Sequence, residues 1–163
     1  MGMDVIGQNP TDEVGEYFRN NVWWWRPLWN YCESVAPELT SKVENAQYND
    51  GDGLDEQDSI LLAEILLAEI ALGNTKQYQD EYEAYHNALP SDPCDFCNGD
   101  PRGALIRPEW PDFEEGVEKF RNPCNKCEGK GSVRPMQTSY PFDVENVAEF
   151  ARFLQTCGGF SIC

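Results

Sequence analysis

The sequence has few basic residues, a single histidine and no long apolar run. Its 163 residues include 12 Lys and Arg against 29 Asp and Glu, which gives a formal net charge of -17 at pH 7. A surface of this charge repels the phosphates of nucleic acids and of anionic lipids, so neither is the expected partner. The longest apolar stretch, residues 60–72, is too short for a bilayer span and contains Glu64 and Glu69, so we expect no membrane segment.

The motifs of common enzymes are also missing. A Ser-His-Asp or Cys-His mechanism would have to use the lone His86 as its base, and no nucleophile motif lies near it. A zinc nucleobase deaminase needs His-x-Glu, and Ala88 stands where that Glu is required. Neither a phosphate-binding Gly-x-x-x-x-Gly-Lys-Ser/Thr loop nor a His-Glu-x-x-His pair occurs. We therefore expect a protein that is not an enzyme, although an unfamiliar activity using carboxylates near His86 stays open.

The cysteine count argues against a disulfide framework. Seven is an odd number, and four of the cysteines form two Cys-x-x-Cys pairs of the metal-ligand type. The first six residues lack the cationic stretch of a secretory signal. These observations predict a reducing compartment, and hence a cytoplasmic protein. The other three cysteines, Cys32, Cys157 and Cys163, are given no chemistry, because free cysteines are most often small buried apolar residues.

The strongest signal is the match between the two cysteine pairs. Cys94 and Cys97 follow a proline, as do Cys124 and Cys127, and a glycine stands two residues after each pair. Two such turns, 26 residues apart, can direct four thiolates at one tetrahedral ion. Four sulfur ligands leave no open coordination position, so the sequence predicts a structural Zn2+ held by these four cysteines. Two unrelated turns, or disulfides, are the alternative.

The second pair, Cys124-x-x-Cys127-x-Gly129-x-Gly131, resembles the repeated units in the cysteine-rich domain of Hsp40-type co-chaperones. The first pair departs from that pattern because Pro101 occupies the place of the second glycine. There are two units here, and the His-Pro-Asp triplet is missing. The resemblance therefore implies a zinc turn and no chaperone partnership.

The periodicity predicts a mainly α fold. The clearest helix covers residues 60–72; Asp55 and Asp58 can cap it, and Gly73 ends it. Since this helix is apolar around most of its circumference, we expect it to lie centrally in the core. A second helix is predicted over 77–88.

The two ends of the chain are predicted to be helical as well. Residues 11–35 contain helix-compatible stretches, with Pro27 opening a second helix at its first turn. Asp143 can cap a helix that ends at Gly158-Gly159, after which an apolar tail docks on the body.

Between these helices lies a stretch rich in proline, glycine and cysteine, with a short helix possible at 113–120. The predicted architecture is a single domain, 1–163. Its helical body covers 11–90 and 136–163, and a loop-rich, zinc-stapled insert covers 91–135.

Two further features admit two interpretations each. Trp23, Trp24 and Trp25 cannot all face one side of a helix, and they fit either core packing or a base-stacking platform. Residues 41–90 carry eleven acidic residues against Lys42 and Lys76, which is either a solvated face or a partner surface. The candidate partner-binding residues are Asp50, Asp52, Asp55, Glu56 and Asp58. For the Asp50–Gly53 segment a turn with a helix cap is favoured over a calcium loop, because Tyr48 and Ser59 would occupy the first and last ligand positions of the loop and Asp55 its apolar position.

The amino-acid sequences of several segments resemble those of small proteins encoded by tailed bacteriophages and some bacteria. The segments are Met1–Val5, Tyr17–Trp29, Tyr48–Leu54, the two cysteine pairs and Phe153–Cys163. The resemblance implies an accessory protein of the bacterial host cytosol and carries no activity with it.

Together these patterns predict a non-enzymatic zinc protein that binds a host macromolecule, with a host protein favoured over nucleic acid. Its acidic surface would imitate nucleic acid and so inhibit host defence. The alternative is a module for single-stranded nucleic acid, in which the tryptophans stack on bases and Lys126, Lys130 and Arg134 contact phosphates. The sequence gives no oligomeric state.

Overall fold

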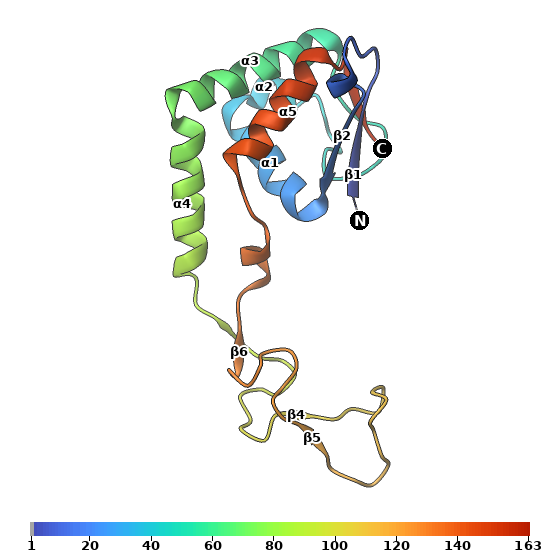
Figure 1. The fold of residues 1–163 in the computed structure, drawn as a ribbon, viewed down its shortest axis with the longest axis vertical. Helices are drawn as coiled ribbons and strands as arrows, with labels where there is room; N and C mark the ends of the chain where they lie inside the picture. Colours follow the sequence, from blue (N-terminus) through green and yellow to red (C-terminus); the bar gives the residue numbers. More distant parts are fainter. Residues whose placement is uncertain (1) are drawn as a thin grey trace. The chain divides into compact units, whose positions relative to one another are not determined.

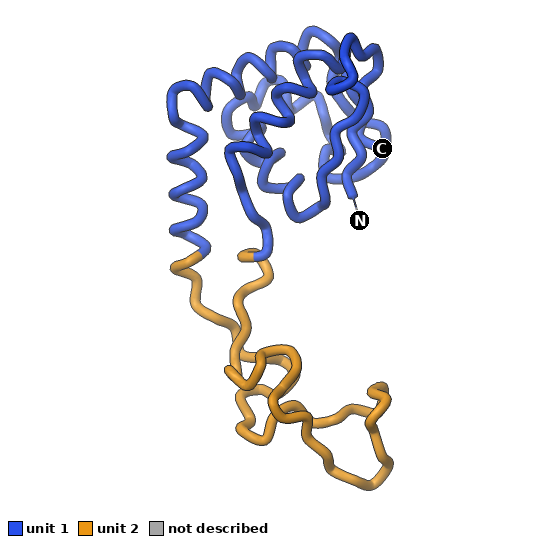
Figure 2. The backbone as a smooth tube through the Cα atoms, viewed as in Figure 1, with its two compact units in different colours: residues 1–86, 139–163 blue, residues 87–138 orange. Residues whose placement is uncertain are grey.

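The computed structural model describes residues 2–163, which form two compact units (Figure 2). Unit 1 comprises the described residues up to His86 together with 139–163, and unit 2 comprises 87–138. Helices account for 43% of the chain and strands for 14%, so the predicted mainly α class holds only loosely. The insert predicted over 91–135 falls within unit 2, and the body reaches back to residue 2 instead of starting at 11.

A three-stranded antiparallel sheet in unit 1 is the element that the helical prediction missed (Figure 1). Its order is β2-β1-β7, from β1 (Gly2–Gly7), β2 (Tyr17–Asn21) and β7 (Phe160–Ile162). Buried residues alternate along β1 and β2, as expected for strands with one face on a core. The prediction of helix from residue 11 is therefore wrong as far as Asn21, since the 3-10 helix η1 (Glu13–Gly15) and β2 precede α1.

The described residues form five α-helices, and side-chain caps open three of them: α1 (Val22–Val35), α2 (Pro37–Thr40), α3 (Glu56–Leu72), α4 (Asn74–Ala88) and α5 (Val144–Thr156). Asn21, Asp55 and Asp143 each accept hydrogen bonds from backbone N–H groups of the first turn, which confirms the caps predicted at Asp55 and Asp143. Asp58, the other cap predicted for this helix, lies within the first turn of α3 and does not cap it. Gly73, in the left-handed region, ends α3 as predicted. Pro27 lies inside α1 and not at its first turn, because Asn21 starts the helix five residues earlier than the proline would.

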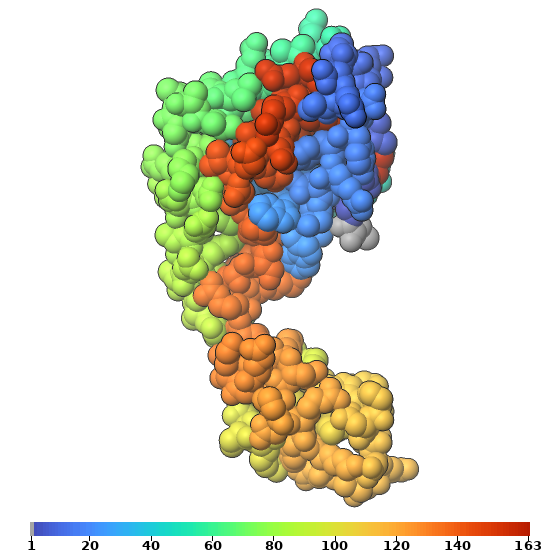
Figure 3. All heavy atoms as spheres, in the orientation of Figure 1, coloured from blue at the N-terminus to red at the C-terminus, as the bar shows by residue number. Residues whose placement is uncertain are grey.

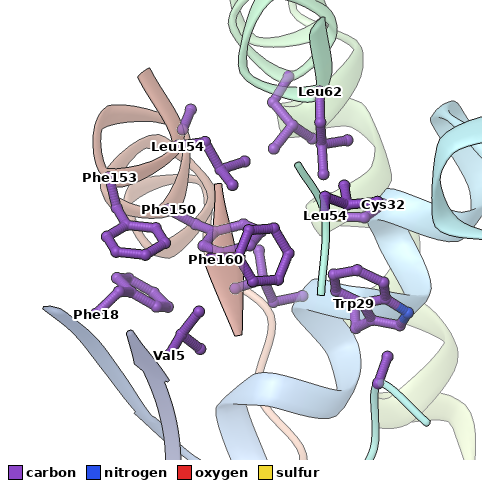
Figure 4. Close-up of a cluster of buried hydrophobic side chains, with 14 of the residues drawn as sticks. Val5, Phe18, Trp29, Cys32, Leu54, Leu62, Phe150, Phe153, Leu154 and Phe160 are labelled. Carbon is purple, nitrogen blue, oxygen red and sulfur yellow. The ribbon is translucent and has the colours of Figure 1, made fainter. Parts of the chain in front are cut away.

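The core of unit 1 forms where the sheet, α1, α3 and α5 meet (Figure 4). Phe18, Phe150, Phe153 and Phe160 pack against one another with ring centroids 5.1–6.3 Å apart. Phe160 lies on β7, so the tail docks into the core as predicted. This contact joins residues from both ends of the sequence.

The tryptophan run is divided between core and surface. Trp25 is fully buried, stacks on Trp29 at 5.5 Å and donates its indole N–H to the carbonyl of Ala46 at 2.7 Å. Trp23 is partly exposed and packs on Tyr140 at 4.7 Å. Core packing is therefore the role of Trp25, and it has no free face for a nucleic-acid base.

The prediction that α3 lies centrally is wrong. Only Ser59, Leu62, Ala63 and Leu66 of this helix are buried. Figure 1 shows α3 beside α5 at the outer edge of unit 1, so the core covers one face of the helix and leaves the other in solvent. No helix among the described residues is long and apolar enough to cross a membrane.

Unit 2 is one long antiparallel hairpin with short ladders: β3 (Asp92–Pro93) with β6 (Ser132–Val133), and β4 (Ala104–Leu105) with β5 (Phe120–Arg121). Pro93 pairs with Ser132, and Ala104 pairs with Arg121 eleven residues further along in each direction, so both ladders share one register. The helix predicted at 113–120 is wrong: Gly116 has a φ of 77°, and Phe120 begins β5.

Candidate metal centre

The two cysteine turns meet between the ladders of unit 2. The Sγ atoms of Cys94, Cys97, Cys124 and Cys127 all lie within 4.8 Å of one another, and these residues are at most 6% exposed. The Cys94 and Cys124 sulfurs are 3.8 Å apart, and those of Cys97 and Cys127 are 3.5 Å apart. A Zn–S bond of about 2.3 Å gives tetrahedral S···S edges of about 3.8 Å. All four predicted ligands are thus brought together in a cluster that could hold a metal ion.

The two turns have the same backbone structure, thirty residues apart. In each turn the carbonyl of the first cysteine accepts a hydrogen bond from the backbone N–H of the residue four positions later. Asn98 donates to Cys94 at 2.6 Å, and Glu128 donates to Cys124 at 2.7 Å. Asn98 and Glu128 both adopt left-handed φ angles, 51° and 54°, and the glycine after each does the same. This repeated reversal aims both sulfurs of a turn at the same point, which is why the glycines are required.

Backbone N–H groups stabilise sulfur charge in the cluster. Gly131 N–H donates to the Cys127 sulfur at 3.3 Å. Burial raises the pKa of Cys127, but this N–H and hydrogen bonds from the other three thiols lower it to about 7. The N–H of Gly99 lowers the pKa of Cys97, whereas burial and its bonds to the other thiols raise it to about 12. Without a metal, the Cys127 sulfur therefore ionises readily, whereas Cys97 keeps a proton that an incoming ion must displace.

The cluster is surrounded by aromatic rings and cations, from Phe96, Trp110, Lys126 and Arg121, of which only Lys126 was singled out in the sequence analysis. Phe96, between the first two cysteines, packs against Trp110 at 5.5 Å. Lys126 lies 4.9 Å from the Phe96 ring and bridges to Asp95 at 2.5 Å, which lowers the pKa of that carboxyl. The guanidinium of Arg121 lies 4.6 Å from the Trp110 ring. The sequence could have indicated these contacts, because Phe96 lies between the first two cysteines, Trp110 follows them, and aromatic rings attract cations.

A shallow pocket adjoins the second turn. It is lined by Ser91, Lys126, Cys127, Glu128, Lys130, Ser132, Val133 and Arg134. Glu128 forms an ion pair with Lys130 at 3.3 Å. The three cations are the residues that the nucleic-acid alternative selected, so the structure brings that set together. Trp23 to Trp25 belong to unit 1 and not to this pocket.

The acidic candidates in unit 1 mostly have structural tasks. Asp52 accepts hydrogen bonds from the backbone N–H groups of Asn45 and Gly53, at 2.9 and 3.0 Å. Asp55 caps α3, and Asp58 forms an ion pair with Lys42 at 2.5 Å.

Asp50 and Glu56 complete the predicted set, and both are exposed. Asp52, Asp55 and Asp58 are thus engaged in contacts within unit 1, and Asp50 also accepts a long hydrogen bond from the backbone N–H of Asp52 at 3.4 Å.

His86 lies on α4, with its ring 4.1 Å from the ring of Tyr82. It packs in an aromatic cluster that also includes Phe142. Among the predicted site residues, the four cysteines are the set whose reactive atoms lie together.

Comparison of the chain with models of protein families, with curated protein sequences and with solved structures gave no match. The candidate metal centre is thus identified by its own residues and geometry alone.

Proposed function

We propose that the four cysteines bind one structural Zn2+ and that the protein is a non-enzymatic binding protein of the bacterial host cytosol. The observation that carries the proposal is the buried thiol cluster, whose four sulfurs lie within 4.8 Å of one another. Four sulfur ligands would fill every position of a tetrahedral ion and leave none for a substrate. Thiolates also suit Fe2+ and Cu(I), and Zn2+ is proposed because a closed set of four cysteine ligands is typical of structural zinc.

Metal analysis tests the first part. Native mass spectrometry of the purified protein should give one zinc per chain, and Co2+ substitution should give the absorption bands of a tetrahedral thiolate site. Cys124→Ser should lose both signals, whereas Cys163→Ser, at an exposed cysteine outside the cluster, should retain them. Retained stoichiometry in Cys124→Ser would contradict the assignment.

The binding partner that the charges favour is a basic protein surface. Unit 1 holds 20 of the 29 acidic residues and only 5 of the 12 basic ones. Such a surface attracts cationic proteins over a Debye length and can occupy the place of nucleic acid on them. In line with the resemblance to phage proteins, the proposed partner is a nucleic-acid-binding host protein whose action is inhibited.

The test is a competition assay between this protein and duplex DNA for a basic host DNA-binding protein, at rising salt. Binding should weaken with salt, and it should weaken further in Asp50→Asn/Glu56→Gln, which removes two exposed charges and leaves the cap of α3 intact. Glu109→Gln/Glu115→Gln, a matched change of two exposed carboxylates in unit 2, is the control. Salt-independent binding, or an equal loss in both variants, would overturn this part of the proposal.

The second candidate, a module for single-stranded nucleic acid, is favoured by one observation: the pocket lined by Lys126, Lys130 and Arg134. Unit 2 holds 7 of the 12 basic residues. A gel shift with single-stranded DNA and RNA at low salt distinguishes the two candidates. Retardation that Lys130→Gln/Arg134→Gln removes would support this one, and its absence at micromolar protein would exclude it.

A further inference from the structure

The exposed side of α3 is a largely apolar surface, interrupted by Gln57 and Glu64. We call it the α3 outer face; it consists of Ile60, Leu61, Ala68, Ala71 and Leu72, with Ile65, which is partly buried against the core, at its border. Ile60, Leu61 and Leu72 are 40%, 46% and 73% exposed, and both alanines are also exposed. In Figure 3 this helix, coloured teal to green, forms the upper edge of unit 1. An apolar patch of this kind marks an interaction site.

The spacing of the α3 outer face matches another helix. Leu61, Ile65, Ala68 and Leu72 follow one another at intervals of four, three and four residues. This is the interval at which side chains of one helix line up along the seam with a second helix. The small side chain of Ala68 in the middle of the seam lets the second backbone approach closely. The face therefore fits a helix better than a strand or a loop.

The charges around the face decide what kind of helix it fits. α3 has four acidic residues and no basic one. At about 100° per residue, Glu56 and Glu69 fall at opposite borders of the outer face and Glu64 falls within it. The last turn has no basic residue to complement its carbonyl groups, so that end of the helix also favours a cation.

We propose that the α3 outer face docks an amphipathic helix of a partner protein, with an apolar side flanked by Lys or Arg. The proposal deepens the proposed function, because it rests on unit 1 binding a basic protein surface. A second copy of the chain is disfavoured as the occupant: pairing two outer faces would bring Glu56, Glu64 and Glu69 of one copy close to those of the other.

The probe is a synthetic peptide of about 18 residues, matching α3 in length, with leucine at the heptad seam positions and lysine elsewhere. A scrambled peptide of the same composition and a Leu/Glu peptide of the same pattern are its controls. Fluorescence anisotropy should show binding of the patterned Leu/Lys peptide, and its affinity should exceed that of the scrambled peptide by at least about tenfold.

Two double variants locate the binding surface. Leu61→Ser/Leu72→Ser should weaken binding of the patterned peptide by at least about tenfold, since two exposed leucines no longer contribute apolar contact. Ile6→Ser/Val14→Ser is the matched control, because these residues are 45% and 53% exposed elsewhere on unit 1. It should leave the affinity unchanged. Circular dichroism checks that both variants keep their helices.

The outcomes separate this proposal from the proposed function. Equal, salt-sensitive binding of the patterned and scrambled peptides, unaffected by Leu61→Ser/Leu72→Ser, would leave the acidic surface as the binder and overturn docking on α3. Failure of every lysine peptide to bind would overturn both. A concentration-dependent dimer in analytical ultracentrifugation, lost in Leu61→Ser/Leu72→Ser, would assign the face to a second copy and also overturn the proposal.

Discussion

Unit 1 and unit 2 are stabilised by different physical means. Unit 1 has a core of 25 buried residues, dominated by aromatic and branched aliphatic side chains. The buried cluster of unit 2 has five residues, and four of them are cysteines. A segment of 52 residues with so little apolar burial cannot offset its conformational entropy without a metal or another crosslink. One short chain thus combines a unit with a large apolar core and a unit whose buried cluster is mostly cysteine, and the proposed metal would stabilise the second unit.

Metal removal should have the largest effect on the stability of unit 2 relative to that of unit 1. A chelator should unfold unit 2 and leave unit 1 folded, because zinc binding contributes on the order of 10 kcal/mol to small thiolate sites. Hydrogen exchange measured by mass spectrometry should show loss of protection confined to peptides from 87–138. Loss of protection across β1 or α5 at the same chelator concentration would show that the two units are not independent.

Substitution of a single cysteine should separate the units in the same way. Cys94→Ser should lose the metal and the fold of unit 2, since three thiolates leave the tetrahedron incomplete. Cys32→Ser is the matched control, because Cys32 is equally buried but lies in α1. It should lower the stability of unit 1 and leave one zinc per chain, as measured by elemental analysis beside thermal denaturation.

The reverse experiment is a cavity in the core of unit 1. Phe150→Ala should cost about 3–5 kcal/mol of unfolding free energy, because Phe150 is fully buried and touches Phe18, Trp25 and Phe160. Denaturant unfolding of unit 1 should shift while the Co2+ spectrum of unit 2 stays unchanged. A change in that spectrum would contradict the separation of the two units.

A close backbone contact provides a smaller perturbation of unit 1. A Cβ atom on Gly53 would lie 1.9 Å from the carbonyl oxygen of Phe160, so Gly53→Ala should displace β7 and cost about 1–3 kcal/mol. Gly51→Ala is a weaker control, because its Cβ meets nothing within 4 Å, although the φ of Gly51 is positive. Chemical denaturation of both variants measures the difference, and equal losses would refute the steric explanation.

Two substitutions of Asp55 distinguish the contribution of its charge from the contribution of its capping hydrogen bond. Their effect on stability is expected to be small. Asp55→Ala should destabilise unit 1 by about 1 kcal/mol through loss of the α3 cap, whereas Asp55→Asn keeps a capping oxygen and should be nearly neutral. Thermal unfolding of the two variants makes the comparison. If both lose the same stability, the contribution of Asp55 is electrostatic.

The parts of the structure that the sequence predicted are governed by local chemistry. The cluster of four cysteines follows from two short motifs, and the caps at Asp55 and Asp143 depend on residues within one helical turn. Gly73 ends α3 for an equally local reason, because its left-handed φ suits glycine.

The parts that failed depend on distant contacts. Tyr17–Asn21 is a strand because β1 lies beside it, and β1 in turn pairs with residues more than 150 positions away. The burial of α3 could not be read from its composition, since apolar residues on both sides of a helix predict a central position whether or not a second layer covers them. Trp25 and Trp23 differ in burial for the same reason: their neighbours, Ala46 and Tyr140, come from other parts of the chain.

The pairing of β1 with β7 also determines when the sheet of unit 1 can be completed during synthesis of the chain. The sheet of unit 1 stays open until Phe160–Ile162 emerges, so the nascent body must wait with β1 and α3 exposed. The hairpin of unit 2, by contrast, needs no residue beyond Val133 to pair its strands. If unit 2 takes up a metal ion as proposed, it can do so before the sheet of unit 1 closes, although its residues lie in the middle of the chain.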